Sequence, residues 1–328
     1  MFSLSRPKDL VLAVTYKCNS RCRMCNIWQM SPVPILALSE YEKLPKSLRD
    51  INISGGEPFL RPDLVDLIKL IVKNNSHARI IISSNGFATD LIKKKMTEIL
   101  KIKPTIGIGI SLDGIGATHE MVRRIPDAYE KVLATLRMLK DDLKMTNLRI
   151  AFTAGDYNIT ELPLVYKLAN DLGIEFTLAA VHNADVYFNI AENKITKIYE
   201  FRKQFSQIIN SELKSFSPKR WARAYFAYAL LKFVESRKRV LPNYSGIDNI
   251  FIDPEGNVRP SDVSGHLMGN LKDFDNYKDL ITGEQAQKAV EVERYAQNWM
   301  ICTARSAIRR HFIPVIFWII WHKLFGYK

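Results

Sequence analysis

The chain has 328 residues, of which 47% are apolar and 25% are charged, and its formal net charge is +13. This is the composition of one large globular domain or of a domain with an appendage, and four cysteines in such a length exclude a disulfide framework. The charge favours anionic partners such as nucleic acid, phosphorylated substrates or anionic lipid, without choosing among them.

Short β-branched and apolar runs alternate along the chain with segments of helical periodicity. The runs predict strands over 10–15, 51–54, 79–84, 105–111, 148–154 and 175–181. Helices are predicted within 61–74, 90–101, 128–143 and 160–173, where apolar residues recur every three or four positions. Alternating strands and helices predict an α/β fold with a parallel sheet covered by helices, either open and doubly wound or forming all or part of a barrel.

Unusual residues follow the predicted strands at the points where the strands end. They are Cys18, Cys22 and Cys25 after the first strand, "GGEP" at 55–58 after the second, Asn85-Gly86 after the third and "SLDG" at 111–114 from the fourth. Because the carboxyl ends of parallel strands meet at one edge, these residues are predicted to share a rim, where such folds place their chemistry.

The three clustered cysteines indicate a metal centre with one ligand missing. Thiolates hold iron–sulfur clusters and zinc, and both usually take four ligands. If the missing ligand is a small molecule, one iron of a four-iron cluster is open to bind it. A zinc site completed by histidine lacks the usual local spacing. The third interpretation, cysteines packed in the core along one face of a helix, conflicts with the polar residues between them, Asn19, Ser20, Arg21 and Arg23.

The spacing C-x3-C-x2-C after the first strand resembles the signature of the radical S-adenosylmethionine (SAM) superfamily, over about residues 8 to 185. The resemblance implies a partial (β/α)6 barrel of TIM-like type and a [4Fe–4S] cluster held by Cys18, Cys22 and Cys25. It also implies that SAM chelates the open iron and that an external electron donor reduces the cluster. The activity implied is that of an oxidoreductase or transferase, in which cleaved SAM yields a 5′-deoxyadenosyl radical that abstracts hydrogen from the substrate.

The same resemblance implies which residues bind SAM, but it assigns no other catalytic residue. Gly55, Gly56, Glu57 and Pro58 are similar to the segment that binds the SAM amino group. Ser111 matches the position that reaches the ribose, and Arg123, with Arg124 as the alternative, matches the arginine that pairs with the SAM carboxylate. Ser84 and Asn85 are further candidates beside the ribose or adenine. Met24 departs from the family, because the residue before the third cysteine is usually aromatic.

The organisation of the chain changes near residue 190, so a barrel over 1–190 and an extension over 191–328 are expected. Residues 194–240 predict amphipathic helices whose basic faces are solvated, an interpretation favoured over nucleic-acid binding. A strand–turn–strand pattern follows, and with 269–271 and 298–305 it resembles the SPASM/twitch extension of radical SAM enzymes. Ser261 and Asn298 stand where that family has cysteines, and Cys302 is alone. We therefore expect a degenerate extension that packs over the barrel mouth, without an auxiliary cluster and with Cys302 buried.

Three functions are compatible with these features. The favoured one is a radical SAM enzyme acting on an unidentified small-molecule, peptide, lipid-linked or other envelope-related substrate. The alternatives are an RNA-modifying radical SAM enzyme, suggested by the basic charge alone, and a non-catalytic iron–sulfur scaffold. Nucleic acid is not the expected partner. His182, Asn183 and Asp185, after the sixth strand, are candidates for the substrate pocket.

The unpaired thiols and the absence of a secretory pattern at the start of the given sequence predict a cytoplasmic protein. Near the end, Phe312–Trp321 is an unbroken apolar run, about half of the roughly twenty residues that a membrane-spanning helix needs. Basic residues flank this run, which predicts either a segment lying in the surface of a membrane or a last helix packed on the protein's own core or on a partner.

Overall fold

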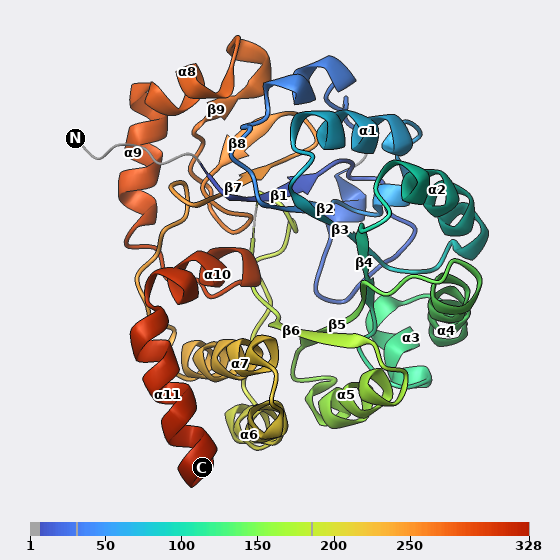
Figure 1. Cartoon of the computed structure of the whole chain (residues 1–328), viewed down its shortest axis with the longest axis vertical. Helices are drawn as coiled ribbons and strands as arrows, with labels where there is room; N and C mark the ends of the chain where they lie inside the picture. The colour runs from blue at the N-terminus through green and yellow to red at the C-terminus, as the bar shows by residue number, and fades with distance from the viewer. Residues whose placement is uncertain (1–6, 31, 185, 328) are drawn as a thin grey trace.

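A curved nine-stranded sheet forms the centre of the computed structural model, which describes residues 7–30, 32–184 and 186–327 (Figure 1). Its strand order is β6-β5-β4-β3-β2-β1-β7-β8-β9. The first six strands are β1 Asp9–Ala13, β2 Asp50–Ser54, β3 Arg79–Ser84, β4 Gly107–Ser111, β5 Leu148–Ala154 and β6 Glu175–Ala180. Each pairs in parallel with its neighbour, so the six predicted strands and their parallel arrangement are confirmed.

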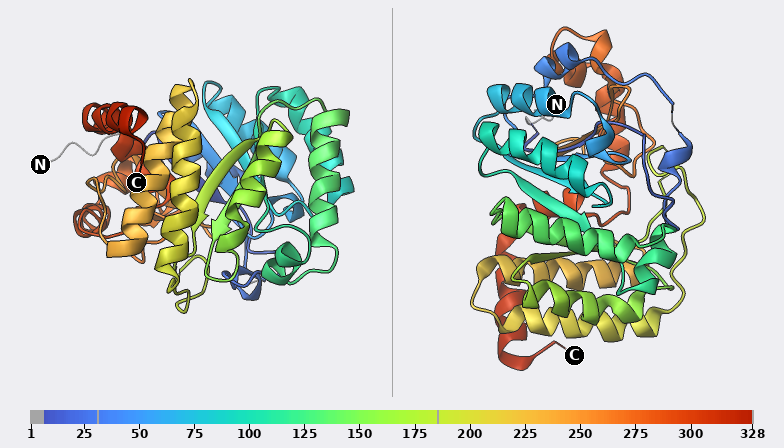
Figure 2. Two further views of the ribbon diagram at one scale, coloured as in Figure 1. Left: turned by 90° about the horizontal axis from the view of Figure 1, so that it is seen from below. Right: turned by 90° about the vertical axis from the view of Figure 1, so that its right-hand side faces the viewer.

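Helices cover the outer face of this sheet, which is not closed, as expected for a partial barrel (Figures 1 and 2). They are α1 Leu64–Asn74, α2 Thr89–Ile102, α3 Ala117–Arg123, α4 Ala128–Arg137 and α5 Leu162–Asp171. A π-helical turn, η4 Met138–Asp142, continues α4, and short 3-10 helices occur at η1 Ile27–Gln29, η2 Leu38–Lys43, η3 Pro58–Leu60, η5 Ile159–Glu161 and η6 Leu271–Asp273. The four predicted helical segments are confirmed, whereas α3 is a helix that the periodicity did not reveal.

Strand β1 separates two apolar cores because its side chains alternate between the faces of the sheet. Leu10 and Leu12 point to the main core between the sheet and the helices. Val11 and Ala13 point to a smaller inner core inside the barrel, which also contains Tyr187. All five residues of β1 are buried, so the chain leaves the middle of the protein just before the cysteine segment begins.

The predicted hairpin is present as β7 Asn249–Ile252 and β8 Asn257–Arg259, and β9 Gly269–Asn270 pairs with β8. Its position differs from the expectation that it packs over the barrel mouth. Strand β7 pairs in parallel with β1, from Asp9 opposite Asn249 to Leu12 opposite Ile252, and so extends the sheet. The physical reason is that β1 would otherwise bury a row of unpaired backbone groups along its free edge.

The remaining helices lie at the side of the sheet beyond β6 and around the hairpin. They are α6 Ile198–Lys214, α7 Pro218–Ser236, α8 Tyr277–Thr282, α9 Glu284–Glu293, α10 Ile301–Arg310 and α11 Phe312–Phe325. The core-face interpretation of 194–240 is confirmed, since Phe201, Phe205, Ile208 and Ile209 of α6 are all buried. Arg309 of α10 donates to the Asp9 carboxylate of β1 at 2.8 and 2.9 Å, which ties the extension to the barrel. Because one sheet spans both parts, a domain boundary near residue 190 stays a prediction.

Truncating the centre of β1 is expected to destabilise the whole fold. Leu12 is fully buried, so Leu12→Ala should lower the free energy of unfolding by about 2–5 kcal/mol, through lost burial and the cavity left behind. Leu164→Ala is the matched control, because the Leu164 side chain on α5 is 51% exposed, and we expect a change within about 0.5 kcal/mol. Urea unfolding monitored by circular dichroism measures both. Equal effects would contradict the assignment of β1 to the core.

Candidate active site

One cavity of about 240 Å³ lies at the carboxyl ends of the strands, on the rim that the sequence predicts. All three clustered cysteines, Cys18, Cys22 and Cys25, line it. Seven of the predicted SAM-binding residues line it as well: Met24, Gly55, Gly56, Ser84, Asn85, Ser111 and Arg123. Glu57 and Pro58 lie outside its lining. Residues from four successive strand ends thus meet around one space.

The cysteines lie on a segment without regular helix, between β1 and the short helix η1. The interpretation that they pack along one face of a helix is therefore wrong. The backbone N–H groups of Arg21 and Arg23 donate to the carbonyls of Arg123 (3.2 Å) and Val122 (2.9 Å), so α3 holds the segment in place. The Ser20 hydroxyl lies 3.0 Å from the sulfur of Cys22.

Burial raises the pKa of Cys18 and of Cys25 to about 12, which keeps these two thiols protonated in the absence of metal. A bound iron replaces the thiol proton, and the Arg123 guanidinium, whose Nη1 is 3.4 Å from the Cys22 sulfur, can offset the resulting negative charge. Across the described ranges, no three His, Cys, Asp or Glu side chains converge on a single metal ion. A four-iron cluster does not need such convergence, because each thiolate binds a different iron. The donor set therefore fits a cluster.

Gly55 and Gly56 bring two backbone segments into close contact. A Cβ at Gly56 would lie 2.3 Å from the Lys17 carbonyl oxygen, and one at Gly55 would lie 2.5 Å from that of Thr15. Gly56 N–H also donates to the Thr15 carbonyl at 2.7 Å. Here the glycines first of all let the segment after β2 pack against the segment that leads into Cys18.

Glu57 is buried, and its carboxylate is occupied by donors from the same rim. It accepts hydrogen bonds from the backbone N–H of Phe59 (3.2 Å), the Ser84 hydroxyl (3.0 Å) and the backbone N–H of Asn85 (2.8 Å). Burial raises its pKa to about 7 despite these donors. The carboxylate thus positions Ser84 and Asn85, both of which line the cavity, whereas its role as acceptor for the SAM amino group stays a prediction.

Arg123 occupies the cavity wall, and its neighbour Arg124 is exposed at the end of α3. Arg123 Nη2 lies 2.5 Å from a carboxylate oxygen of Asp113, which is fully buried. Burial acts to lower the pKa of Arg123, but the Asp113 carboxylate and the Cys22 sulfur raise it above the ordinary value. Arg123 Nε has no hydrogen-bond partner among the described residues. Of the two candidate arginines, Arg123 is the one placed to meet an anionic ligand group.

The sequence interpretation missed an apolar and aromatic wall of the same cavity, formed by Ile27, Trp28, Val181, Tyr187, Phe188 and Met300. The Tyr187 hydroxyl donates to the Gly55 carbonyl at 3.2 Å and lies 3.1 Å from the Ser54 hydroxyl, which anchors this wall to the end of β2. The available signal was the pair of adjacent aromatic residues, Tyr187 and Phe188, just after the sixth strand.

Three residues are predicted as candidates for the substrate pocket, and the structure bears on each of them differently. His182 lines the cavity, and its Nε2 has no partner in the described part of the chain. Asn183 is exposed and accepts a hydrogen bond from the backbone N–H of Asn193 at 2.8 Å. Asp185 lies outside the described residues. Of the two that the structure describes, His182 is the one that lies beside the cavity.

A polar network occupies the positions of the extension where cysteines are expected. The Ser261 hydroxyl and the Asn298 amide both donate to the buried Glu293 carboxylate at 3.2 Å. Cys302 is buried, as predicted, and its thiol donates to the Asp262 carboxylate at 3.3 Å. Burial raises the pKa of Cys302 well above its ordinary value. Hydrogen bonds thus connect the residues at these positions of the extension.

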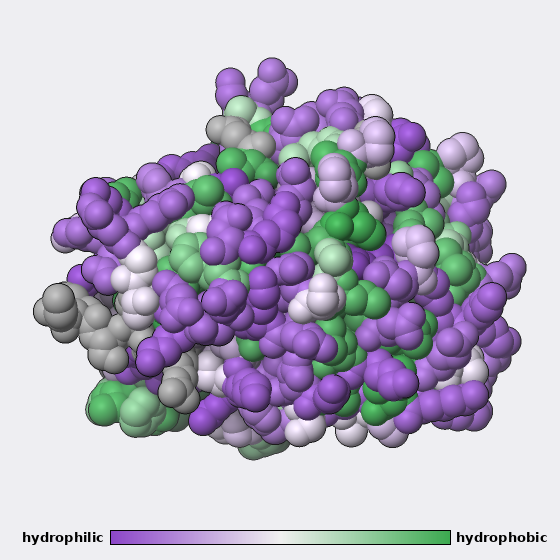
Figure 3. Space-filling view, turned by 90° about the horizontal axis from the view of Figure 1, so that it is seen from above, coloured by the Kyte–Doolittle hydropathy of each residue, from purple (hydrophilic) through white to green (hydrophobic). Residues whose placement is uncertain are grey.

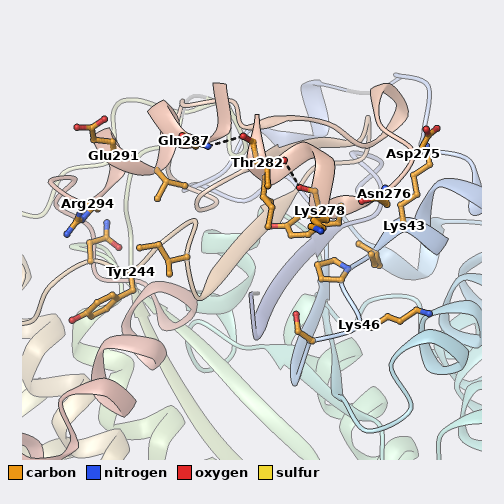
Figure 4. Close-up of a pocket in the computed structure, with 18 of the residues that line it drawn as sticks. Lys43, Lys46, Tyr244, Asp275, Asn276, Lys278, Thr282, Gln287, Glu291 and Arg294 are labelled. Carbon is orange, nitrogen blue, oxygen red and sulfur yellow. Dashed lines mark hydrogen bonds between the residues drawn. The ribbon is translucent and has the colours of Figure 1, made fainter. Parts of the chain in front are cut away.

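A second and larger hollow, of about 1690 Å³, lies at the opposite ends of the strands (Figure 4). Residues before β2 and β7, including Lys46 and Tyr244, line it together with α8 and α9. Its wall mixes basic and acidic side chains such as Lys278 and Glu291 and contains no thiol. Although it is larger, it lacks the convergent chemistry of the cysteine cavity, which remains the candidate active site.

Comparison with known proteins identifies the class. Residues 12–153 match the model of the radical SAM superfamily. The chain is 29% identical to pre-heme d1 synthase of Dinoroseobacter shibae, covering 84% of this chain and 74% of that protein. It is 28% identical to AdoMet-dependent heme synthase of Methanosarcina barkeri, covering 51% of this chain and 48% of that protein. The chain thus spans only about half the length of this second relative.

A solved structure has the same fold. Native anSMEcpe with bound AdoMet and Kp18Cys peptide superposes with a TM-score of 0.66 at 16% identity, covering 95% of this chain and 99% of that one. Together with the superfamily match and the cysteine cavity, these findings define the class of protein. The chain therefore contains a radical SAM domain over residues 12–153, and [4Fe–4S] and SAM are the cofactors of that superfamily.

The contact between the two glycines and the cysteine segment generates a test. Gly56→Ala should lower the thermal midpoint by several degrees and reduce the iron retained after reconstitution, because its Cβ overlaps backbone atoms that cannot move away freely. Gly265→Ala is the control, since nothing lies within 4 Å of a Cβ at that position. Calorimetry and iron analysis measure the two effects. Unchanged iron content in Gly56→Ala would contradict the coupling of this turn to the cysteines.

A second test concerns His119, whose Nδ1 accepts a hydrogen bond from the Asp113 backbone N–H at 3.0 Å. Burial lowers its pKa from 6.5 to about 3, so between these values the unfolded chain binds a proton that the folded chain excludes. The contribution of His119 to the free energy of unfolding is therefore present above pH 6.5 and is lost as the pH falls. Between pH 6.5 and 5 the free energy of unfolding should fall by about 2 kcal/mol through this group. His119→Asn should lose less stability over this range. Urea unfolding at several pH values, without added iron, measures the difference, and identical slopes would contradict the prediction.

Proposed function

We propose that Cys18, Cys22 and Cys25 hold a [4Fe–4S] cluster and that SAM binds beside it in the same cavity. The observation that carries this proposal is the meeting of three thiols and seven predicted SAM-binding residues around one space. When bound, the cluster and SAM supply reductive cleavage of the sulfonium and a 5′-deoxyadenosyl radical that abstracts hydrogen from a substrate carbon. An external donor supplies the electron.

The chain's own residues bind and orient the cofactors in this proposal. Arg123 offsets the charge of the thiolates and presents its unpartnered Nε to the SAM carboxylate. Ser111 and Asn85 contact the ribose and adenine side from the ends of β4 and β3. The aromatic wall around Tyr187 and Phe188 excludes water from the space where hydrogen is abstracted.

For the substrate we propose a tetrapyrrole-related small molecule as the first candidate. Its support is that two relatives are named as a pre-heme d1 synthase and a heme synthase, and that the first alignment covers 84% of this chain. The flat aromatic side chains of the cavity wall and the net charge of +13 suit a flat, acidic molecule. A peptide is the second candidate, because a structure of the same fold contains one in addition to AdoMet.

The iron and sulfide content of the protein tests whether the three cysteines hold a cluster. After anaerobic reconstitution, the protein should carry about four irons and four sulfides, and Cys22→Ala should lose most of them. Cys302→Ala is the matched control, since this thiol lies against Asp262 outside the cavity lining, and it should keep the wild-type iron content. An iron content near eight that persists in Cys22→Ala would show a second cluster and contradict the degenerate extension.

SAM cleavage tests the activity. With a strong reductant, the protein should convert SAM slowly into 5′-deoxyadenosine and methionine, and Cys22→Ala should reduce this conversion to background. Deuterated tetrapyrroles, peptides and RNA are then added in turn, and deuterium is sought in 5′-deoxyadenosine by mass spectrometry. Transfer from a tetrapyrrole supports the first candidate, and transfer from RNA supports the alternative enzyme. A full cluster without any SAM cleavage would indicate the non-catalytic scaffold instead.

A further inference from the structure

The last helix, α11, is fixed to the protein along one face. Val315 and Ile319 are buried there, and the Trp318 ring packs on Tyr225 and Tyr228 of α7, with ring centroids 5.2 and 4.7 Å away. At the end of the helix, Lys323 Nζ donates to the carbonyl of Leu213 at 2.6 Å. The helix is therefore part of the fold. The prediction of a last helix packed on the protein's own core is confirmed for this face of α11.

The opposite face of α11 is apolar and exposed. Eight large hydrophobic side chains on this helix are between 46% and 72% exposed: Phe312, Ile313, Ile316, Phe317, Ile320, Trp321, Leu324 and Phe325. They recur at helical spacing and form one stripe about 20 Å long, which we call the α11 face. The described residues include sixteen exposed large hydrophobics, so half of them lie on this one helix. Apolar stripes of this kind mark interaction sites, since monomeric soluble proteins rarely expose them.

The position of α11 makes this face accessible. The helix runs along the periphery of the molecule, on the side away from α1 to α5 (Figure 1). By contrast, the end of the molecule that carries α8 is covered mainly by hydrophilic side chains, with apolar residues in small groups (Figure 3). The α11 face is thus a local feature and not the general character of the surface.

The charged residues around the α11 face indicate what kind of surface binds to it. After Glu293 the sequence contains no Asp or Glu, but it contains Arg294, Arg305, Arg309, Arg310, Lys323 and Lys328. Arg309 and Arg310 pair with carboxylates of Asp9 and Asp248. Lys323 contacts carbonyl oxygens and aromatic rings, and exposed Lys214 follows Leu213, which supplies one of those carbonyls. Positive charge therefore lies beside the end of the stripe.

We infer that the α11 face docks on the surface of an anionic lipid bilayer. A second copy of the chain would bring two proteins of net charge +13 together along their acid-free segments, whereas an anionic membrane has the opposite charge. No helix in the described part of the chain is long and apolar enough to cross a membrane, so α11 lies along the surface. Its apolar side chains enter the region between headgroups and acyl chains, with Trp321 at the depth that this residue prefers.

Vesicle flotation tests this inference with the full chain. Wild-type protein should float with vesicles of phosphatidylcholine containing about 30% phosphatidylserine, and binding should weaken with salt and with pure phosphatidylcholine. The variant Phe317→Ser/Trp321→Ser removes two exposed side chains of the α11 face and should reduce the bound fraction at least tenfold. The control Leu164→Ser/Tyr295→Ser removes two exposed apolar side chains elsewhere and should bind as the wild type does.

Two measurements keep the outcomes distinct. Circular dichroism melting must show that both variants are folded, which is expected because all four altered side chains are more than half exposed. Analytical ultracentrifugation measures self-association without lipid. Wild-type protein that stays unbound to anionic vesicles overturns the inference. Self-association that Phe317→Ser/Trp321→Ser abolishes, without flotation of the wild type, also overturns it and assigns the α11 face to a second copy.

Discussion

The buried contact between Arg123 and Asp113 is the interaction on which the site depends. Asp113 follows β4 and Arg123 ends α3, and the sulfur of Cys22 lies 3.4 Å from the same guanidinium. A buried charge without a partner is strongly destabilising, so each of these two groups requires the other. Because the backbone carbonyl of Arg123 also accepts the N–H of Arg21, this one residue joins the end of β4 to the cysteine segment.

The sheet makes the walls of the cavity rigid. β1 is buried on both faces and paired along both edges, with β2 on one side and β7 on the other. The cysteine segment therefore starts from a fully constrained strand. A network of backbone hydrogen bonds, including those through Gly56 and Glu57, then fixes the turn after β2 against it. The segment that carries the thiols is thus held in place by backbone hydrogen bonds without forming a regular helix.

The extension contributes residues to the same site. Its strand β7 completes the sheet beside β1, and Met300 reaches the cavity wall. Glu293 is hydrogen-bonded by Ser261 and Asn298, the two residues that stand at expected cysteine positions. Hydrogen bonds to a buried carboxylate therefore stabilise this part of the extension.

Local patterns in the sequence were sufficient for much of the fold and for the thiol cluster. Strand periodicity located β1 to β6 to within two residues at either end, and the spacing of Cys18, Cys22 and Cys25 by itself indicated an open metal centre. These features are predictable because each depends on residues close together in the chain: side-chain alternation within a strand, and thiols within eight positions.

Other features required the tertiary structure, because they depend on which distant segments meet. The pairing of β7 with β1 joins residues about 240 positions apart, and only the folded sheet shows that Arg123 faces the cavity while Arg124 faces solvent. The apolar run after Arg310 was visible in the sequence as a segment that must be covered. Its division into a face packed on α7 and an exposed face was decided by the packing of Trp318 against Tyr225 and Tyr228, a contact that no local pattern encodes.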